Sequence, residues 1–470
     1  MGIQSDLGYD PRDAKSIERY AEQLENKTFY EVVENKSNIP SDAVQAYANR
    51  LRKGGLGNLL EEVYFGYKAN SDQEADFKEA GVELKTTPYE VTKKGELRAG
   101  ERLVLTMINY DGPVENDFYQ SHLWNKMRLI LLIYYWRNKL LNDNLQYKIG
   151  YVRLFTPPEA DLKIIRDDYS YIVNKIQAGK AHELSEADTL YLGACTKGAS
   201  AEKSTVPQYY GDKTPAMKRA FCFKNSYMTY VLNHYIVPSK DKDESIAGGV
   251  VDSFEDYVID KIEAFAGYSA RSLCMKYDID YDKKDKSKWA ALAYRILGIK
   301  NNKAAEFEKA NIVVKTIRIE KNNRIKENMS FPSFKFKELI KEEWDDSTFG
   351  NYLRETKFLF VVYKYDENDE LTLRGAQFWN IPYHDLEVEV RSVWERTVQV
   401  LKEGLKFEKV NGKYKNNFPK PSENRVSHVR PHGQDSKDTY ELPDGREYPK
   451  QCFWLNNTYI YEQIDDRLKR

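Results

Sequence analysis

Three charged residues in the segment 75–90 have the types and spacing that hydrolysis of a phosphodiester would need. The segment reads ADFKEAGVELKTTPYE, in which Asp76 is followed by Glu83 and, two residues later, by Lys85. Apolar and charged residues alternate around Glu83, which predicts a strand that carries Glu83 and Lys85 on one face, roughly 6–7 Å apart. Two converging carboxylates repel each other unless a cation lies between them, and Mg²⁺ accepts such oxygens together with phosphate and water. The pattern therefore predicts a metal site beside a lysine that handles water.

The pattern is short, and an exposed strand can carry the same residues without any chemistry. The segment upstream favours the catalytic interpretation. Residues 51–70 begin with a glycine-containing loop and continue with apolar residues at helical spacing, beside which lie Glu61 and Glu62. One of these two carboxylates can reach the site from the helix. The alternative is that both are solvated residues of an ordinary amphipathic helix.

Length and composition indicate a globular protein of more than one domain. The chain has 470 residues, of which 41% are apolar and 31% charged, and its formal net charge is −1. Any contact with nucleic acid must therefore come from local basic segments such as 315–326 and 410–420. The four cysteines are far apart, which argues against a zinc site or a disulfide framework.

Neither a membrane span nor a signal sequence is expected. The apolar run LILLIYYW at 129–136 is bounded by Arg128 and Arg137, so it predicts a buried element rather than a transmembrane helix. The first 20 residues lack a basic segment followed by an apolar one, and we expect a cytoplasmic protein.

Several segments in order resemble the MutH family of mismatch-repair endonucleases, which nick at GATC, and the GATC-cutting type II restriction endonucleases of the Sau-three-A type. The segment 53–88, KGGLGNLLEEVYFGYKANSDQEADFKEAGVELKTTP, is similar to the catalytic segment of that family. It is followed in the family's order by SHLWNK (121–126), GKAHELSEADTLYLGACTKGAS (179–200) and KRAFCFKNSYMTYVL (218–232).

The resemblance implies roles for individual residues. Asp76 and Glu83 become ligands of Mg²⁺, Lys85 handles the attacking water, and Lys126 approaches the scissile phosphate. The helix carboxylate is Glu62 when counted back from the following glycine and Glu61 when counted forward from the preceding one, because the helix has one extra residue; we favour Glu62. Contacts to DNA are expected from Lys53, Lys197, Arg219 and Lys224.

This chain departs from the family pattern at two places. The family has an arginine–proline pair before its DNA-reading lysine, whereas Cys195 and Thr196 precede Lys197 here. Part of the base readout must then come from elsewhere. MutH also has a tyrosine that senses adenine methylation, and Cys222 stands in its place, where a small buried strand residue is the simpler interpretation.

The second half of the chain repeats the first without its acids. The segment EFEKANIVVKTIRI (306–319) aligns with DFKEAGVELKTTPY (76–89), so that Glu306 replaces the aspartate, Val313 replaces the glutamate, and Lys315 keeps the lysine. Farther on, VSHVRPHGQDSKD (426–438) resembles the DNA-reading loop and contains the arginine–proline pair. Arg430 and His432 are therefore predicted to contact DNA. The alternative is an unrelated α/β domain with a coincidental match.

These observations predict an α/β protein with two restriction-endonuclease-like domains of the PD-(D/E)xK type, each a mixed central sheet flanked by helices. Residues 1–240 would form the catalytic domain, 241–253 a linker, and 254–470 a non-catalytic effector domain that binds a second GATC.

The predicted function is that of a type II restriction endonuclease, which cuts both strands of double-stranded DNA at GATC, 5′ of the G, with Mg²⁺. We expect a monomer that dimerises on DNA, and a cognate GATC methyltransferase as its functional partner. The alternatives are a strand-nicking endonuclease of the mismatch-repair type and a DNA-binding regulator without catalysis.

Overall fold

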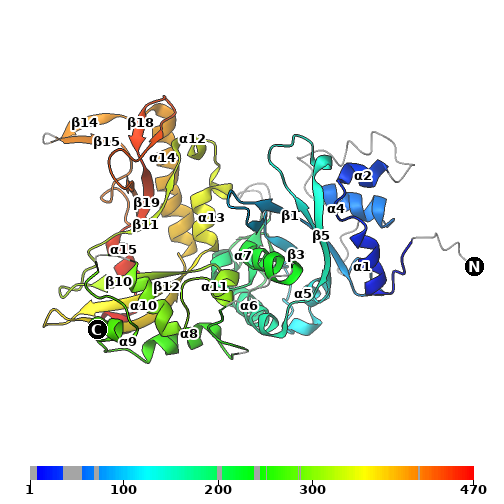
Figure 1. The fold of residues 1–470 in the computed structure, drawn as a ribbon, viewed down its shortest axis with the longest axis horizontal. Helices are drawn as coiled ribbons and strands as arrows, with labels where there is room; N and C mark the ends of the chain where they lie inside the picture. The colour runs from blue at the N-terminus through cyan, green and yellow to red at the C-terminus, as the bar shows by residue number, and fades with distance from the viewer. Residues whose placement is uncertain are drawn as a thin grey trace, which may run out of the picture. The chain divides into compact units, whose positions relative to one another are not determined.

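The chain folds into two compact units, drawn in Figure 1. Unit 1 comprises Met1–Asp243 with Glu308–Ala310, and unit 2 comprises Glu244–Phe307 with Asn311–Arg470. The computed structural model describes the following residues: 8–34, 55–67, 74–197, 204–237, 244–249, 251–283, 285, 287–410 and 413–470.

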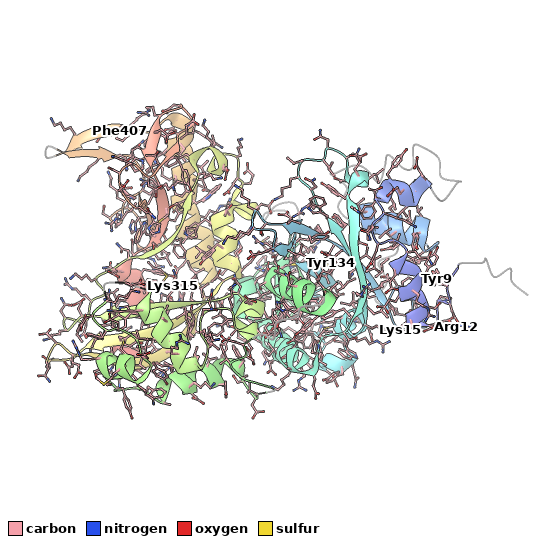
Figure 2. All side chains as sticks on the ribbon, in the orientation of Figure 1. Tyr9, Arg12, Lys15, Tyr134, Lys315 and Phe407 are labelled. Carbon is pink, nitrogen blue, oxygen red and sulfur yellow. The ribbon has the colours of Figure 1, made fainter. Side chains whose placement is uncertain are left out.

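A mixed four-stranded sheet forms the base of unit 1. Its order is β2-β1-β4-β5, with β1 parallel to β4 and the other two pairs antiparallel. The strands are β2 (Leu97–Ala99), β1 (Glu83–Val91), β4 (Ile130–Trp136) and β5 (Lys148–Phe155). β4 is an almost continuous apolar run and is buried on both faces, as a central strand must be. Figure 2 marks Tyr134 of this strand, which is fully buried.

Helices cover this sheet because their apolar residues pack against it. α1 begins after Asp13, whose carboxylate accepts a hydrogen bond from the backbone N–H of Lys15 and so caps the helix. Figure 1 shows α1, α2 and α4 grouped on one side of β5, and their apolar residues share one core with β1, β4 and β5. The helical elements of unit 1 are α1 (Ala14–Glu22), α2 (Phe29–Glu34), α4 (Gly55–Leu59), η1 (Leu60–Tyr64), η2 (Phe118–Gln120), α5 (His122–Met127), η3 (Asn144–Gln146), α6 (Glu159–Gln177), η4 (Ala181–Glu183), η5 (Glu186–Asp188), α7 (Asn225–Tyr230) and η7 (Val231–Ile236).

Unit 1 has a second sheet, antiparallel and three-stranded, of order β3-β9-β6. Its strands are β3 (Leu103–Met107), β9 (Arg219–Phe223) and β6 (Leu192–Thr196), and a short pair is formed by β7 (Thr205–Val206) and β8 (Ala216–Met217). Asp168 of α6 fixes the start of β6, because its buried carboxylate accepts hydrogen bonds of 2.7–2.9 Å from the backbone N–H groups of Leu190, Tyr191 and Leu192. A side chain of α6 therefore aligns the strand that leads to Lys197.

Unit 2 contains the same two kinds of sheet. The order β10-β12-β13 has a parallel pair followed by an antiparallel one, as β1-β4-β5 has. The antiparallel order β11-β19-β16 matches β3-β9-β6. The strands are β10 (Ile312–Ile319), β12 (Lys357–Tyr365), β13 (Leu371–Trp379), β11 (Met329–Phe334), β19 (Gln451–Leu455) and β16 (Ser427–Pro431). Lys315 of β10 is paired with Phe360 of β12, just as Lys85 is paired with Leu132.

Two hairpins extend unit 2 beyond this shared plan, and Figure 1 shows them at one end of it. The rings of Phe407 and Tyr448 lie 5.6 Å apart and join one hairpin to the other. The hairpins are β14 (Phe407–Val410) with β15 (Lys413–Asn416), and β17 (Thr439–Glu441) with β18 (Glu447–Pro449). The helical elements of unit 2 are α8 (Phe254–Glu263), α9 (Ala270–Lys276), α10 (Lys288–Leu297), α12 (Phe336–Leu339), η8 (Trp344–Asp346), α13 (Thr348–Glu355), η9 (Asp385–Val390), α14 (Arg391–Glu403), α15 (Asn457–Gln463) and α16 (Asp466–Lys469). The helix α11 (Ala305–Ala310) begins in unit 2, and its last three residues belong to unit 1.

The predicted fold class is confirmed, with mixed sheets flanked by helices in both units. The second, antiparallel sheet of each unit was not predicted from the sequence. The assignment of catalysis to residues 1–240 and of an effector role to 254–470 stays a prediction. Within the described residues, no helix is long and apolar enough to cross a bilayer.

Asp168 offers a test of how the start of β6 is held. Asp168→Ala should lower the free energy of unfolding by about 3 kcal/mol, because three buried N–H groups lose a charged acceptor. The neighbouring Asp167→Ala is the matched control, since Asp167 is half-exposed and forms a surface ion pair with Lys163 at 2.7 Å. Its effect should stay within about 0.5 kcal/mol in the same denaturant titration. Equal effects of the two changes would show that Asp168 does not hold the strand.

Candidate active site

The start of β1 opens onto a cleft of about 830 Å³ in unit 1. Glu83 and Lys85 of β1 line it together with Asp76, Glu61 and Lys126. Residues of β3 and α6 form the remaining walls. The structure thus brings together the residues that the sequence pattern and the family resemblance selected, with Glu61 in place of Glu62.

Glu83 is the centre of the charge arrangement. Its side chain is 2% exposed, and each of its oxygens has a lysine partner: Oε1 lies 2.8 Å from Lys85 Nζ and Oε2 lies 3.1 Å from Lys126 Nζ. Lys126 Nζ also donates to the backbone carbonyl of Glu74 at 2.6 Å. A buried carboxylate is tolerated only when it is paired and hydrogen-bonded in this way.

Helix α5 fixes Lys126. Ser121 caps the helix by accepting a hydrogen bond from the backbone N–H of Trp124 at 3.1 Å. Lys126 follows on the last turn, and its side chain is only 10% exposed. Lys85 is attached to the sheet and Lys126 to a capped helix, so both ammonium groups reach Glu83 from rigid elements.

Asp76 folds back onto the strand, as predicted. The bridge between Phe77 and Val82 closes a turn, in which Gly81 has the positive φ of +66° that favours glycine. Asp76 Oδ2 accepts a hydrogen bond from the backbone N–H of Leu84 at 2.8 Å. Burial, together with the nearby carboxylate of Glu83, raises the pKa of Asp76 to about 6.

The helix carboxylate at the cleft is Glu61. Burial, together with the charge of Asp76, raises the pKa of Glu61 to about 7. Glu62 is exposed and does not line the cleft, so the position at the cleft belongs to the alternative, Glu61, and a catalytic role of Glu62 stays a prediction. The reason is local: η1 is a π-helix from Leu60 to Tyr64, and a π-turn accommodates one extra residue and rotates those that follow. Whether Glu61 takes part in catalysis stays a prediction.

The donor set fits a hard cation that keeps several water ligands. Within the ranges that the structure describes, no three His, Cys, Asp or Glu side chains are close enough to enclose a metal ion. Asp76 and Glu83 nevertheless supply the one or two carboxylates that Mg²⁺ takes along with water and phosphate. The hydroxyl of Tyr67 is buried near Asp76 and has no hydrogen-bond partner among the described residues. Such a group can bind a water of a hydrated ion, and no residue pattern in the sequence pointed to Tyr67.

The residues predicted to contact DNA differ in their exposure to solvent. Lys197 is half-exposed just after β6, and its backbone N–H donates to the Lys218 carbonyl at 2.7 Å. Arg430 and His432 are exposed at the end of β16, and both lie near Trp454, with the guanidinium 5.6 Å and the imidazole 5.4 Å from the centre of its ring. Lys53 lies outside the described residues.

Arg219 and Lys224 are buried instead of facing solvent. Arg219 Nη1 donates to the carbonyl of Ala194 at 2.7 Å, and Lys224 Nζ donates to the carbonyl of Thr189. Both side chains hold the backbone at or before β6. In this conformation they support the segment that leads to Lys197, and their direct contact with DNA stays a prediction.

Unit 2 has lost the corresponding carboxylates in two different ways. Val313 stands where Glu83 stands in unit 1, at the same register of the parallel strand pair. Glu306 keeps the acidic position but is buried, and it accepts hydrogen bonds from Ser245 Oγ at 2.6 Å and from the backbone of Ile246 and Ala247 at 3.1 and 3.2 Å. The carboxylate of Glu306 therefore holds residues 245–247, at the start of unit 2.

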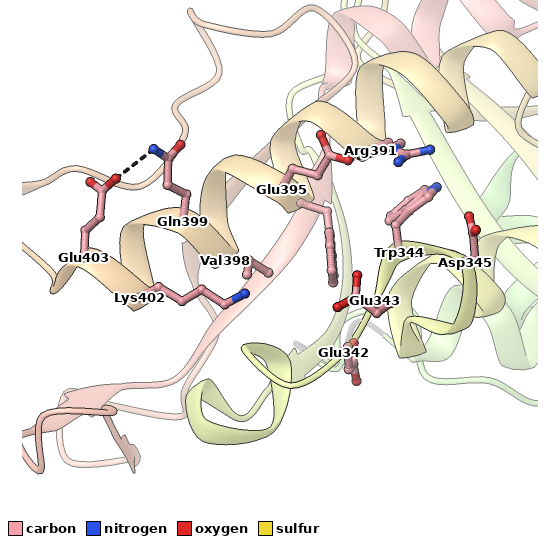
Figure 3. Close-up of a pocket in the computed structure, with 11 residues that line it drawn as sticks. Glu342, Glu343, Trp344, Asp345, Arg391, Glu395, Val398, Gln399, Lys402 and Glu403 are labelled. Carbon is pink, nitrogen blue, oxygen red and sulfur yellow. Dashed lines mark hydrogen bonds and ion pairs between the residues drawn. The ribbon is translucent and has the colours of Figure 1, made fainter. Parts of the chain in front are cut away.

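Another cleft of unit 2, between η8 and α14, has a volume of about 440 Å³ and is lined mainly by acids and two tryptophans (Figure 3). Figure 3 shows Arg391 turned toward Glu395, at 2.7 Å, and Gln399 toward Glu403. Its acidic lining is unsuited to DNA phosphates.

Known proteins are similar to this chain in sequence, and one family matches it in two segments. The family described as DNA mismatch repair enzyme MutH matches residues 65–168 and again residues 297–388. The type II restriction enzyme Sau3AI of Staphylococcus aureus is 37% identical over 464 residues, which cover 88% of this chain and 93% of that enzyme. The DNA mismatch repair protein MutH of Shigella boydii serotype 18 is 27% identical over 187 residues, or 39% of this chain and 79% of that protein.

The chain belongs to the MutH-like family of type II restriction endonucleases. The predicted family and the predicted class of enzyme, a site-specific deoxyribonuclease, are confirmed. The match of the MutH family to both halves also agrees with the repeated sheet orders of the two units. MutH itself matches only a minor part of the chain, whereas the restriction enzyme matches nearly all of it.

The raised pKa values in the cleft of this endonuclease predict how its stability depends on pH. Without divalent metal, the unfolded chain releases the protons of Asp76 and Glu61 near pH 4, whereas the folded state holds them up to about pH 6 and pH 7. Stability should therefore fall as the pH rises from about 4 to about 7, and it should level off above that. Asp76→Asn should raise the free energy of unfolding in EDTA at pH 7.5 by about 1–2 kcal/mol and flatten this dependence.

Asp111→Asn is the matched control, because Asp111 lines the same cleft but is exposed. It should change neither the stability nor its pH dependence. A less stable Asp76→Asn protein in EDTA at pH 7.5 would contradict the predicted repulsion.

Proposed function

We propose that this enzyme hydrolyses both strands of double-stranded DNA at GATC, 5′ of the G, with Mg²⁺ as its cofactor. The observation that carries the proposal is the single cleft in which Asp76, Glu83, Lys85 and Lys126 meet. The sequence GATC and the position of the cut come from the family resemblance, and the relative named as a type II restriction enzyme supports cleavage of DNA at specific sites. In the cell the enzyme acts in the cytoplasm, beside a methyltransferase that protects the same sites.

Lys85 and Lys126 would act on the attacking water and on the phosphate. Lys85 lies at the cleft with its ammonium 2.8 Å from Glu83, where it can orient a water for in-line attack on the phosphorus. Lys126 lies on the other oxygen of Glu83 and can stabilise the charge that develops on the phosphate. Asp76 and Glu83 would hold the Mg²⁺, which supplies Lewis-acid stabilisation of that charge when bound.

Unit 2 takes the effector role in this proposal. It lacks a counterpart of Glu83, so it cannot hold the metal in the same way, and yet it keeps the arginine and histidine of a reading loop in exposed positions. A guanidinium can donate to guanine O6 and N7 together. We propose that Arg430 and His432 contact a second GATC and that the monomer dimerises on DNA, which brings two catalytic units to one duplex.

The acids are tested by cleavage. Asp76→Ala and Glu83→Ala should each reduce plasmid cleavage in Mg²⁺ by more than about 10³-fold, because the metal ligands are lost. Binding to a GATC duplex should stay within about tenfold of the wild type, since these acids repel phosphate when no metal is bound.

The control is Glu79→Ala, an exposed acid in the same turn that should leave cleavage unchanged. Sequencing the ends of the products gives the site and the offset. Single-strand nicks as the final product would favour a mismatch-repair type of activity, and full activity of either variant would exclude the assignment.

The effector role is tested by the number of sites. The wild type at low concentration should cut a two-site plasmid about tenfold faster than a one-site plasmid, because the tether raises the local concentration of the second site. Arg430→Ala should remove most of this difference and leave the slow one-site rate unchanged. Arg396→Ala, which removes an exposed arginine of α14, should behave as the wild type. Equal wild-type rates on the two plasmids would leave unit 2 a structural support.

A further inference from the structure

Unit 2 has a cavity beside the lysine that corresponds to the catalytic one. It has a volume of about 540 Å³ and runs along β10 from Val314 to Arg318, with the start of β11 opposite. In unit 1 the cleft at Lys85 is likewise lined by β1 and β3. Figure 2 marks Lys315 within unit 2. The two lysines thus occupy the same place between corresponding strands.

The surroundings of the two lysines differ in charge. Lys85 is paired with Glu83 at 2.8 Å, whereas Lys315 has no acidic partner among the residues that the structure describes. The residue two positions before Lys315 is Val313, and Glu306 is engaged by Ser245 and two backbone N–H groups. Lys315 Nζ has one long hydrogen bond, of 3.4 Å, to the carbonyl of Ser330.

Burial of the Lys315 ammonium group costs free energy. Burial lowers the pKa of Lys315, because the low-polarity surroundings disfavour the ammonium. Its Nζ lies 5.6 Å from the ring centre of Phe331, which offsets only part of that cost. Arg318 and Lys326 also line the cavity, against Glu320 and Glu327, and Arg318 is paired with Glu327 at 3.2 Å. The balance of the lining is therefore positive, and an anion is the ligand that would complete it.

We propose that the Lys315 cavity binds a phosphate group of DNA and that it does so without a divalent cation. The acids of unit 1 need a metal before a phosphate can approach, whereas here Val313 has removed the acid that would repel it. The inference rests on the proposed effector role of unit 2 and gives it a backbone contact beside the base contacts of Arg430. The phosphate would be held and not cut, because the metal ligands are missing.

The experiment uses the full chain in EDTA and the variant Lys315→Met. Methionine keeps the length and the packing on Phe331 but removes the charge. The affinity for a GATC duplex, measured by fluorescence anisotropy, should fall by about five- to tenfold, and the salt dependence should lose about one phosphate contact. The melting temperature of the variant without ligand should be unchanged or higher, which separates lost binding from lost folding.

Lys341→Gln is the matched control, since it removes an exposed positive charge from the same unit. It should leave the affinity within about twofold. A second arm measures the rise in melting temperature caused by inorganic phosphate. If Lys315→Met weakens only the phosphate response, the cavity takes free phosphate and the DNA assignment is overturned; if both arms match the wild type, the cavity is no phosphate site.

The cleavage assay, and not the binding assay in EDTA, shows whether the proposed function fails. The wild type then shows no cleavage at GATC, or the same rate on one-site and two-site plasmids, whatever Lys315→Met does in EDTA. A wild type that prefers two sites, combined with an unaffected Lys315→Met protein, would remove this inference alone.

Discussion

The burial of one carboxylate, Glu83, between two ammonium groups is the constraint on which the catalytic unit depends. A charge that is 2% exposed survives only with partners held in place, and those partners come from the sheet and from a capped helix. Burial raises the pKa of both Asp76 and Glu61, and the neighbouring carboxylates add to this effect. The parallel pair of β1 and β4 holds Glu83 and Lys85 beside these acids.

Unit 2 shows what the same scaffold becomes when this constraint is released. The pairing of β10 with β12 repeats that of β1 with β4, so the backbone still presents a lysine at the same register. Val313 stands in the place of the buried acid. Lys315 therefore lacks the carboxylate that pairs with Lys85 in unit 1. Glu306 has changed from a free acid to an anchor for residues 245–247. A carboxylate that no longer has a cation to bind is stable only if backbone N–H groups satisfy it.

The sequence could predict what depends on local period and spacing. The alternation around Glu83 predicted the strand, the glycine at 81 agreed with a fold-back of Asp76, and the repeated segment at 306–319 predicted the matching strand pair. It could not predict that Glu61 rather than Glu62 reaches the cleft, because a π-turn shifts the helix register without a distinct residue pattern. Arg219 and Lys224 were expected at DNA because the family resemblance implied this role. Their carbonyl partners, Ala194 and Thr189, are distant in sequence and become visible only in the fold.

The two units divide the requirements for cutting and for reading DNA unequally, under the function proposed here. Unit 1 holds the acids but has Cys195 and Thr196 before its reading lysine, and the thiol is buried. Unit 2 lacks a counterpart of Glu83 on β10 but exposes a guanidinium and an imidazole next to Trp454. A guanidinium in the groove discriminates bases by donating two hydrogen bonds, which a buried thiol cannot do. A second unit on the same chain can therefore supply the DNA contacts that unit 1 lacks, and so strengthen the binding of the whole chain to DNA. The active site of unit 1 then does not have to hold the base-reading side chains as well.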